Sequence, residues 1–316
     1  MPRETRRCEP LLPTSNFESQ YSAMVKHLPP AVKPLLALRN PHALPSPPLP
    51  QLHALFRNTF RDAQAKKAET GWLVLTTCSL LTANRPSAVG HLYRFVTRTD
   101  ANNISSRRGV TEAVNKAALM RESALKSVIF VGVPRVILSL AALSEALDDD
   151  VRASLRQESH RTATPENVEA TIRRGKALWD NIYAPHADKL HAKLGSYHPD
   201  FISFIIQSYG SILAPMPGAT RAFGDASDAA DPDQGNLSRV QGSVVGTACL
   251  RAEGGVGPQL TSHVFGLLKA RSVDGLSEED AWLASDEGTE WVVRTVDNIL
   301  EGVEADPVGP AAKAKL

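Results

Sequence analysis

Apolar residues recur at spacings of three and four along most of the chain, as they do on one face of an α-helix. The sequence has no run of alternating apolar and polar residues bounded by turns, which would indicate a half-buried strand. The pattern therefore predicts an all-α protein. The expected helices span residues 17–27, 50–67, 71–82, 86–98, 110–130, 134–147, 166–182, 186–194, 199–212, 238–251, 258–270, 278–284 and 286–301.

Capping residues and prolines mark the ends of these helices. Residues 164–166 supply a threonine N-cap, a proline at the first helical position and an acidic first turn. The proline within 132–135 ends one apolar helix and begins the next, because it lacks an amide donor and clashes with the preceding turn. Loops are expected at 39–50, 99–109 and 214–237, and the last of these is predicted to be disordered or a lid.

One passage occurs twice in the chain. Each copy has a helix of small residues with one cysteine, then a polar turn, then a helix with one histidine. The first copy carries Cys78 and His91, 13 positions apart, and the second carries Cys249 and His263, 14 positions apart. A repeat on this scale predicts a duplicated domain.

The predicted division follows from this repeat and from an acidic stretch near residue 150. Residues 1–150 form a first domain with an N-terminal helical extension, and residues 151–302 form a second domain that contains the disordered 214–237. The boundary falls between 148 and 165, and 303–316 is a flexible tail.

The composition of the chain disfavours nucleic acid and membrane surfaces as binding partners. The 42% of hydrophobic and 22% of charged residues are typical of a globular protein, and 35 basic against 34 acidic residues give no net field to attract nucleic acid or a membrane surface. No apolar run reaches the roughly 20 residues of a membrane span. The three cysteines are far apart, which predicts neither a disulfide framework nor a metal site. The basic N-terminus is not followed by the apolar segment of a secretory signal.

The C-terminus resembles a targeting signal. Ala314, Lys315 and Leu316 follow the pattern of the Ser-Lys-Leu peroxisomal address, with alanine in place of serine. We therefore expect the peroxisomal import receptor as a partner and the peroxisome as the location. The alternative is a cytoplasmic protein whose tail is not read.

The order of these elements resembles the carboxymuconolactone decarboxylase and alkylhydroperoxidase-D-like family. The resemblance runs from the helix at 71–81 through the first histidine helix to 121–147, and again through 174–210 and 258–270, about two thirds of the chain. It implies two tandem helical domains of the alkylhydroperoxidase-D-like type that form a pseudo-dimer. Single-domain relatives assemble into dimers and rings, so the resemblance also allows a homo-oligomer.

The peroxidase branch of that family carries a C-x-x-C motif seven and four positions before the histidine. Those positions hold Asn84 and Ser87 in the first half and Val256 and Gln259 in the second, so dithiol peroxidase activity is not expected. A cysteine acting alone remains open. Both repeat cysteines lie among small residues of apolar helices, where a free cysteine is more often a buried hydrophobe.

The decarboxylase branch needs neither a cysteine nor a cofactor. The resemblance makes His91 and His263 the candidate acid and base, because imidazole titrates near neutral pH; each can equally be a satisfied core residue. Glu69 precedes His91 by 22 positions, whereas the corresponding residue of the second half is Gln241. If a Glu–His pair performs the acid/base catalysis, only the first half retains both residues of the pair. Glu69 can instead be a solvated carboxylate favoured by the helix dipole.

Two further polar residues are candidates for binding. The guanidinium of Arg135 could hold a substrate carboxylate, although a surface charge there needs no function. Gln259, one turn before His263, could orient its ring.

The sequence thus predicts cofactor-independent acid/base chemistry on a small acidic or lactone-type metabolite, with a decarboxylase-like lyase as the candidate enzyme. The alternative is a binding or assembly protein that keeps the fold without catalysis. The two hypotheses differ in whether a cavity adjoins the histidines.

Overall fold

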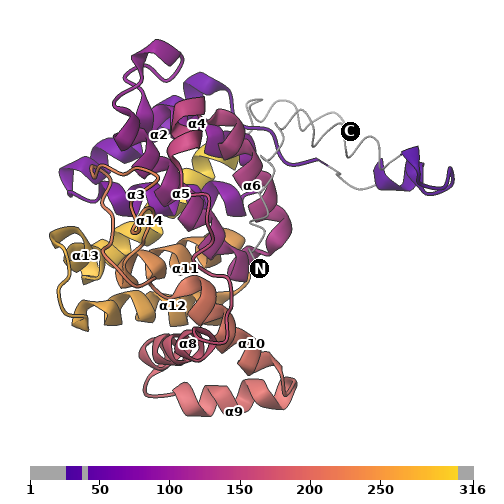
Figure 1. Cartoon of the computed structure of the whole chain (residues 1–316), viewed down its shortest axis with the longest axis vertical. Coiled ribbons are helices and arrows are strands. Elements are labelled where there is room, and N and C mark those ends of the chain that lie inside the picture. The colour runs from indigo at the N-terminus through magenta and orange to yellow at the C-terminus, as the bar shows by residue number, and fades with distance from the viewer. Residues whose placement is uncertain (1–25, 38–41, 305–316) are drawn as a thin grey trace, which may run out of the picture. The chain divides into compact units, whose positions relative to one another are not determined.

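The computed structural model describes residues 26–37 and 42–304. The chain divides into two compact units, Met1–Ala43 and Leu44–Leu316. In the first, the described residues form the short 3₁₀-helix η1 (Lys33–Ala37). The second contains all the other elements (Figure 1). They are α2 (Leu49–Ala65), α3 (Glu69–Thr82), α4 (Pro86–Thr97), η2 (Ile104–Ser106), α5 (Val110–Val131), α6 (Val133–Ala146), α7 (Asp149–Ser154), α8 (Val168–Tyr183), α9 (Ala187–Tyr197), α10 (Phe201–Ser208), η3 (Tyr209–Leu213), α11 (Arg239–Glu253), α12 (Gly257–Lys269), η4 (Ala270–Ser272), α13 (Glu278–Leu283) and α14 (Asp286–Glu304).

The all-α prediction is confirmed, since the described ranges contain helices and turns but no strand. The expected helices of the second unit agree with the observed ones to within a few residues. The sequence did not predict α7 or the short 3₁₀-helix η2, which lies in the predicted loop 99–109. The helix predicted at 17–27 falls mostly outside the described residues. None of the described helices is long and apolar enough to cross a membrane.

The two cysteine helices, α3 and α11, pack against each other at the centre of the second unit. α5 and α14 each contact both of them (Figure 1). Cys78 on α3 and Cys249 on α11 converge on Ser127 of α5, whose Oγ lies 3.4 Å and 3.3 Å from the two sulfur atoms. Both cysteines are fully buried, and burial raises the pKa of the Cys78 thiol. Against the opposing effect of burial, hydrogen bonds from Cys78, Ser127 and Thr82 lower the pKa of Cys249. The complete burial of both thiols nevertheless favours packing over nucleophilic chemistry, because the reactive form is an accessible thiolate.

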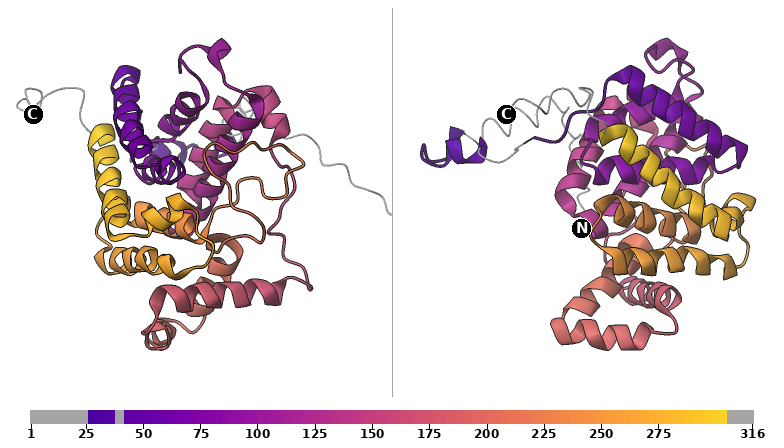
Figure 2. Two further views of the ribbon diagram at one scale, coloured as in Figure 1. Left: turned by 90° about the vertical axis from the view of Figure 1, so that its left-hand side faces the viewer. Right: turned by 180° about the vertical axis from the view of Figure 1, so that it is seen from behind.

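The first and last described α-helices of the second unit, α2 and α14, meet on one side of this centre. α14 lies beside α2 (Figure 2), where Trp291 Nε1 donates to Asp62 Oδ2 at 2.6 Å and Gln51 Nε2 donates to the Gly302 carbonyl at 3.2 Å. A single hydrophobic cluster accordingly includes residues from Leu52 to Val303.

Residues on both sides of the predicted boundary at 148–165 contribute to this one cluster. A second, smaller cluster forms around Trp179 and Tyr209, where α8, α10 and η3 pack together (Figures 1 and 2).

Two buried lysines of α5 bind the C-terminal ends of other helices. Lys126 donates its ammonium protons to three successive carbonyls at residues 212–214, over 2.8 to 3.0 Å. Lys116 donates to the Val96 carbonyl at 2.9 Å. Burial lowers the pKa of Lys126 to about 8. A cation at a helix C-terminus satisfies carbonyls that lack a partner within the helix.

The segment 214–237, predicted to be disordered or a lid, is hydrogen-bonded to the first half of the chain. The Phe223 N–H donates to Thr70 Oγ1 at 2.9 Å, and Asn115 Nδ2 donates to the Ala222 carbonyl at 2.6 Å. These bonds attach it to α3 and α5 of the first half. Its composition gave no sign of this because its partners lie more than a hundred residues away in sequence.

Candidate functional site

His91 lines a cleft of about 400 Å³ together with a second histidine, His53 of α2. His91 is half-buried, and His53 is 9% exposed. We call this cavity the His91 cleft. It is lined by Leu49, His53, His91, Arg94, Arg98, Ala101, Asn102, Ile104, Glu145, Ala146, Leu147 and Asp148.

The amphipathic pattern of α4 places the polar side chains of the cleft. Its apolar residues Val89 and Leu92 are fully buried in the core. His91, Arg94 and Arg98 follow one another at intervals of three and four, so they share the opposite face and the end of the helix. The same periodicity that predicted the helix therefore presents an imidazole and two guanidinium groups to one cavity.

The pKa values of both imidazoles of the cleft are lowered, which favours their neutral forms. Burial lowers the pKa of His91, and the positive charges of Arg94 and of a protonated His53 lower it further. Burial also lowers the pKa of His53, with a smaller contribution from Arg57. Near pH 7 each ring is able to accept a proton.

The two arginines of the cleft differ in their partners. Arg98 is buried and its Nη2 lies 3.3 Å from Asp148 Oδ1, while Arg107 approaches the other carboxylate oxygen at 3.4 Å. Arg94 forms no ion pair within the described part of the chain. Its guanidinium is therefore the group best placed to hold an anionic ligand beside His91.

Glu69, the predicted carboxylate partner of His91, does not line this cleft. It is the first residue of α3, which has 14 residues. The turn that leads to His91 follows the last residue of that helix. Its negative charge instead acts on Glu279, whose pKa is raised to about 7, mainly by burial. The carboxylates that line the cleft are Glu145 and Asp148.

Gln241, the counterpart of Glu69, has a structural role. Its side chain accepts from the Ser238 N–H at 3.0 Å, and its own N–H donates to Ser238 Oγ at 3.0 Å. This is a capping box at the start of α11.

His263 lies in different surroundings from its counterpart. It is 4% exposed, and its Nε2 lies 3.4 Å from the hydroxyl of Tyr209, which in turn lies 3.1 Å from the hydroxyl of Tyr183. The ring of Phe130 packs edge-on against it, with centroids 5.1 Å apart. A side chain at Gly246 would place its Cβ 2.6 Å from His263 Nδ1. The imidazole thus occupies a closed space that exists because Gly246 of α11 has no side chain.

Burial, and to a smaller extent the charge of Arg239, lowers the pKa of His263 to about 4. Gln259, which was expected to orient this ring, is exposed, and the hydrogen-bond partner of the ring is Tyr209. His263 is therefore a neutral core residue.

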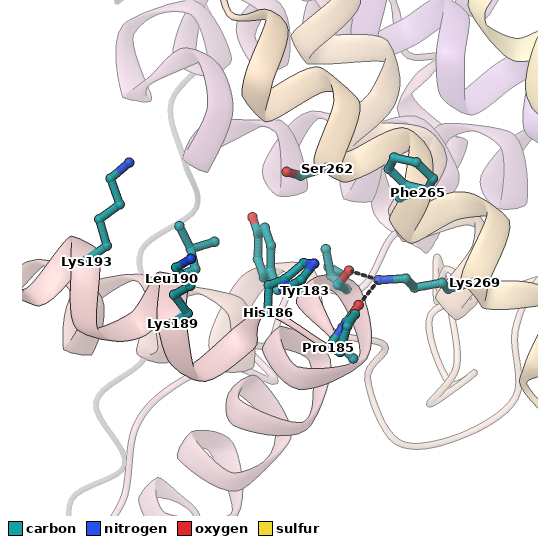
Figure 3. A pocket seen from close by; sticks show the side chains of 11 residues that line it. Tyr183, Pro185, His186, Lys189, Leu190, Lys193, Ser262, Phe265 and Lys269 are labelled. Carbon is teal, nitrogen blue, oxygen red and sulfur yellow. Dashed lines mark hydrogen bonds between the residues drawn. The ribbon is translucent and has the colours of Figure 1, made fainter.

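The hydroxyl chain of His263 leads to a second cavity, between α12 and the α8–α9 turn (Figure 3). Its volume is about 460 Å³, and we call it the Tyr183 groove. Lys269 borders it and donates to the carbonyls of Ile182 at 2.7 Å and Ala184 at 2.5 Å. The lining residues are Ile182, Tyr183, Ala184, Pro185, His186, Lys189, Leu190, Lys193, Ser262, Phe265 and Lys269.

Arg135 lies outside both cavities. Its Nη1 donates to the Thr82 carbonyl at 2.7 Å and to Glu253 Oε2 at 2.7 Å. It therefore links the C-terminal ends of α3 and α11, and a substrate carboxylate would have to displace Glu253.

Sequence reasoning missed His53 and the pair formed by Arg98 and Asp148. His53 lies outside the repeat, on a helix whose pattern marks it only as a buried position. Nothing local indicates that α2 places it next to α4. A basic residue at the end of α4 and the acidic run that begins at Asp148 were visible as a charge pattern, but not as partners.

These observations define an all-helical protein with a polar cleft lined by two histidines. The described residues contain no group of three or more histidine, cysteine or acidic side chains that could hold a metal ion. No protein-family model, curated protein or solved structure matches the chain.

The buried state of His263 predicts a pH-dependent contribution to stability. Its folded pKa of about 4 lies below the ordinary 6.5, so the unfolded chain binds more protons between these values. Relative to a His263→Gln variant, the wild type should lose about 3 kcal/mol of unfolding free energy as the pH falls from 7 to 4. Urea unfolding at several pH values measures this difference.

The same substitution at exposed His186 is the matched control. A difference between wild type and His263→Gln that stays constant over this pH range would contradict a buried neutral imidazole.

Proposed function

We propose that this protein is a cofactor-independent enzyme that transfers protons on a small acidic or lactone-type metabolite in the His91 cleft. The observation that carries the proposal is the cleft itself: two histidines with lowered pKa values line it together with Arg94. The enzyme hypothesis requires a cavity beside His91. A histidine packed into the core without a cavity would favour the non-catalytic alternative.

The chemistry follows from the charges of these side chains. Arg94 would hold a carboxylate of the metabolite, and neutral His91 would accept a proton from a neighbouring acidic position. The imidazolium returns that proton to another carbon of the conjugated system, so that the double bond moves and the carbonyl system can again accept electrons. In a decarboxylation, the bond to the departing carboxylate then breaks, its electron pair passes into this carbonyl system as CO₂ leaves, and solvent supplies the one proton that the net reaction consumes. His53 lines the same cleft and would share this role.

The duplicated fold is part of the proposal. We infer that the two halves are alkylhydroperoxidase-D-like domains fused into a pseudo-dimer. Its support is the central pair α3 and α11, each of which packs against both α5 and α14. The histidine helices α4 and α12 follow this pair in the two halves. Because Asn84 and Ser87 replace the peroxidase motif, the proposed chemistry is decarboxylase-like.

A second candidate function is ligand binding without catalysis. The Tyr183 groove favours it, because Leu190 and Phe265 offer apolar walls while Lys189 and Lys193 form no ion pair within the described residues. Such a groove suits a carboxylic acid with an apolar body. Glu69 does not line the cleft that holds His91, and this separation also favours ligand binding over catalysis by a Glu69–His91 pair.

We also propose that the protein is imported into peroxisomes through its last three residues, the alternative being a cytoplasmic location. These residues lie outside the described ranges.

Replacing His91 with alanine should lower kcat at least ~100-fold, since general acid/base catalysis contributes on that order. The assay is CO₂ release and ¹H NMR on a panel of unsaturated lactone carboxylates and 3-oxo acids. In the wild type, kcat/KM should fall on the acid side with a midpoint below 6.5, because His91 is active only when neutral and its pKa is lowered. Full turnover by a His53→Ala, His91→Ala double variant that stays folded would sink the proposal. His191→Ala, on α9, is the matched control.

For the Tyr183 groove, a lysine-to-glutamine change at both Lys189 and Lys193 should weaken binding of decanoate several-fold and leave binding of decanol unchanged. The loss follows from removal of two cationic groups at an exposed rim. Isothermal titration measures both ligands. If decanoate and decanol bind the wild type equally, the lysines do not select a carboxylate.

Deletion of Ala314, Lys315 and Leu316 should move a fluorescently tagged chain from peroxisomes to the cytosol. Microscopy with a peroxisomal marker measures this, with the tag placed at the N-terminus. A full-length protein that is already cytosolic would reject the targeting proposal.

A further inference from the structure

A third cavity, of about 280 Å³, has an arginine-rich lining. Arg121 comes from α5, and Arg156 and Arg161 come from the segment that follows α7. His160 borders the same cavity. We call it the arginine pocket, and it shares no lining residue with the His91 cleft or the Tyr183 groove.

The positive charges of this pocket outnumber their partners. Its one buried carboxylate, Glu122, already contacts Arg161 and lies 3.4 Å from the Lys126 ammonium. Within the described residues neither Arg121 nor Arg156 forms an ion pair with a carboxylate. These two guanidinium groups therefore have no carboxylate within ion-pair distance, although the exposed Glu158 also lines the pocket.

Hydrogen bonds hold these arginines in place. The Arg156 N–H donates to Gln234 Oε1 at 2.7 Å, and its carbonyl lies 3.4 Å from both terminal nitrogens of Arg121. Arg161 Nε donates to the Ser211 carbonyl at 2.8 Å. The Nε atom of Arg156 is buried and has no hydrogen-bond partner among the described residues. A buried donor without an acceptor is costly unless a ligand or water supplies one.

The electrostatic state of the pocket agrees with this geometry. Partial desolvation and the neighbouring Arg156 lower the pKa of Arg121, and the charge of Glu122 opposes this shift. Partial desolvation, Arg156 and Arg161 likewise lower the pKa of His160, against the opposing charges of Glu158 and Asp233. Clustered like charges destabilise one another, and a bound anion removes that repulsion.

We propose that the arginine pocket binds the phosphate group of a small phosphorylated metabolite, or phosphate itself. Guanidinium forks match phosphate oxygens in pairs, and a dianion would neutralise the two uncompensated arginines. The volume admits a phosphate and a few further atoms but not a nucleotide-sized ligand. This site is independent of the proposed proton transfer.

The test uses the full-length protein with inorganic phosphate and glycerol phosphate as probes, at constant ionic strength set with chloride. Isothermal titration should show saturable binding, and thermal unfolding should shift upward with ligand concentration by mass action. Arg121→Gln and Arg156→Gln should each weaken binding at least tenfold. The matched control is Arg173→Gln, a surface arginine paired with Glu169, which should bind as the wild type does.

If Arg156→Gln does not fold, Arg121→Lys keeps the charge but removes the fork, and it should still weaken binding. Tighter binding of glycerol phosphate would assign the site to a metabolite, and tighter binding of inorganic phosphate would assign it to the free ion; either supports the proposal. Phosphate that acts no differently from chloride, or variants that bind as tightly as Arg173→Gln, would overturn it. Binding should persist in His91→Ala, which separates this test from that of the proposed enzyme.

Discussion

The close approach of α3 and α11 is the constraint on which the rest of the structure depends. At their contact the side chains are small: Cys78 and Cys249 meet across Ser127 of α5, with sulfur–oxygen distances of 3.4 and 3.3 Å. Larger side chains there would force the helices apart, since protein cores are close-packed. Because α5 and α14 each contact both central helices, such a displacement would reach the whole core.

α5 connects this centre to the surface sites. Along one helix it supplies the serine between the two cysteines, the buried lysines that hold the ends of α4 and η3, and Arg121 of the arginine pocket. The lysine contacts are possible because their ammonium groups find carbonyl partners, without which burial of a charge would be prohibitive. The buried lysines of α5 therefore stabilise the packing of other helices, and its Arg121 contributes a guanidinium group without an ion-pair partner among the described residues to the arginine pocket.

The repeat identified two histidines, but the structure gave them unlike environments. His91 faces a polar cleft, while His263 is enclosed by Phe130, Tyr209 and the space left by Gly246. The repeat could not reveal this difference, because α8 packs against α12 and Tyr209 of η3 reaches His263, and both elements lie outside the duplicated passage. His53 was missed for the same reason, since its neighbours come from another helix.

The sequence by itself determined the helical class and nearly every helix boundary, because these follow from local periodicity, capping residues and prolines. It also identified His91 and the small-residue helices as features worth locating. Only the tertiary structure decided that Glu69 lies away from His91 and that 214–237 is bound to α3 and α5. Those outcomes depend on side chains far apart in the chain, whose meeting is set by how the helices pack and not by the residues next to them.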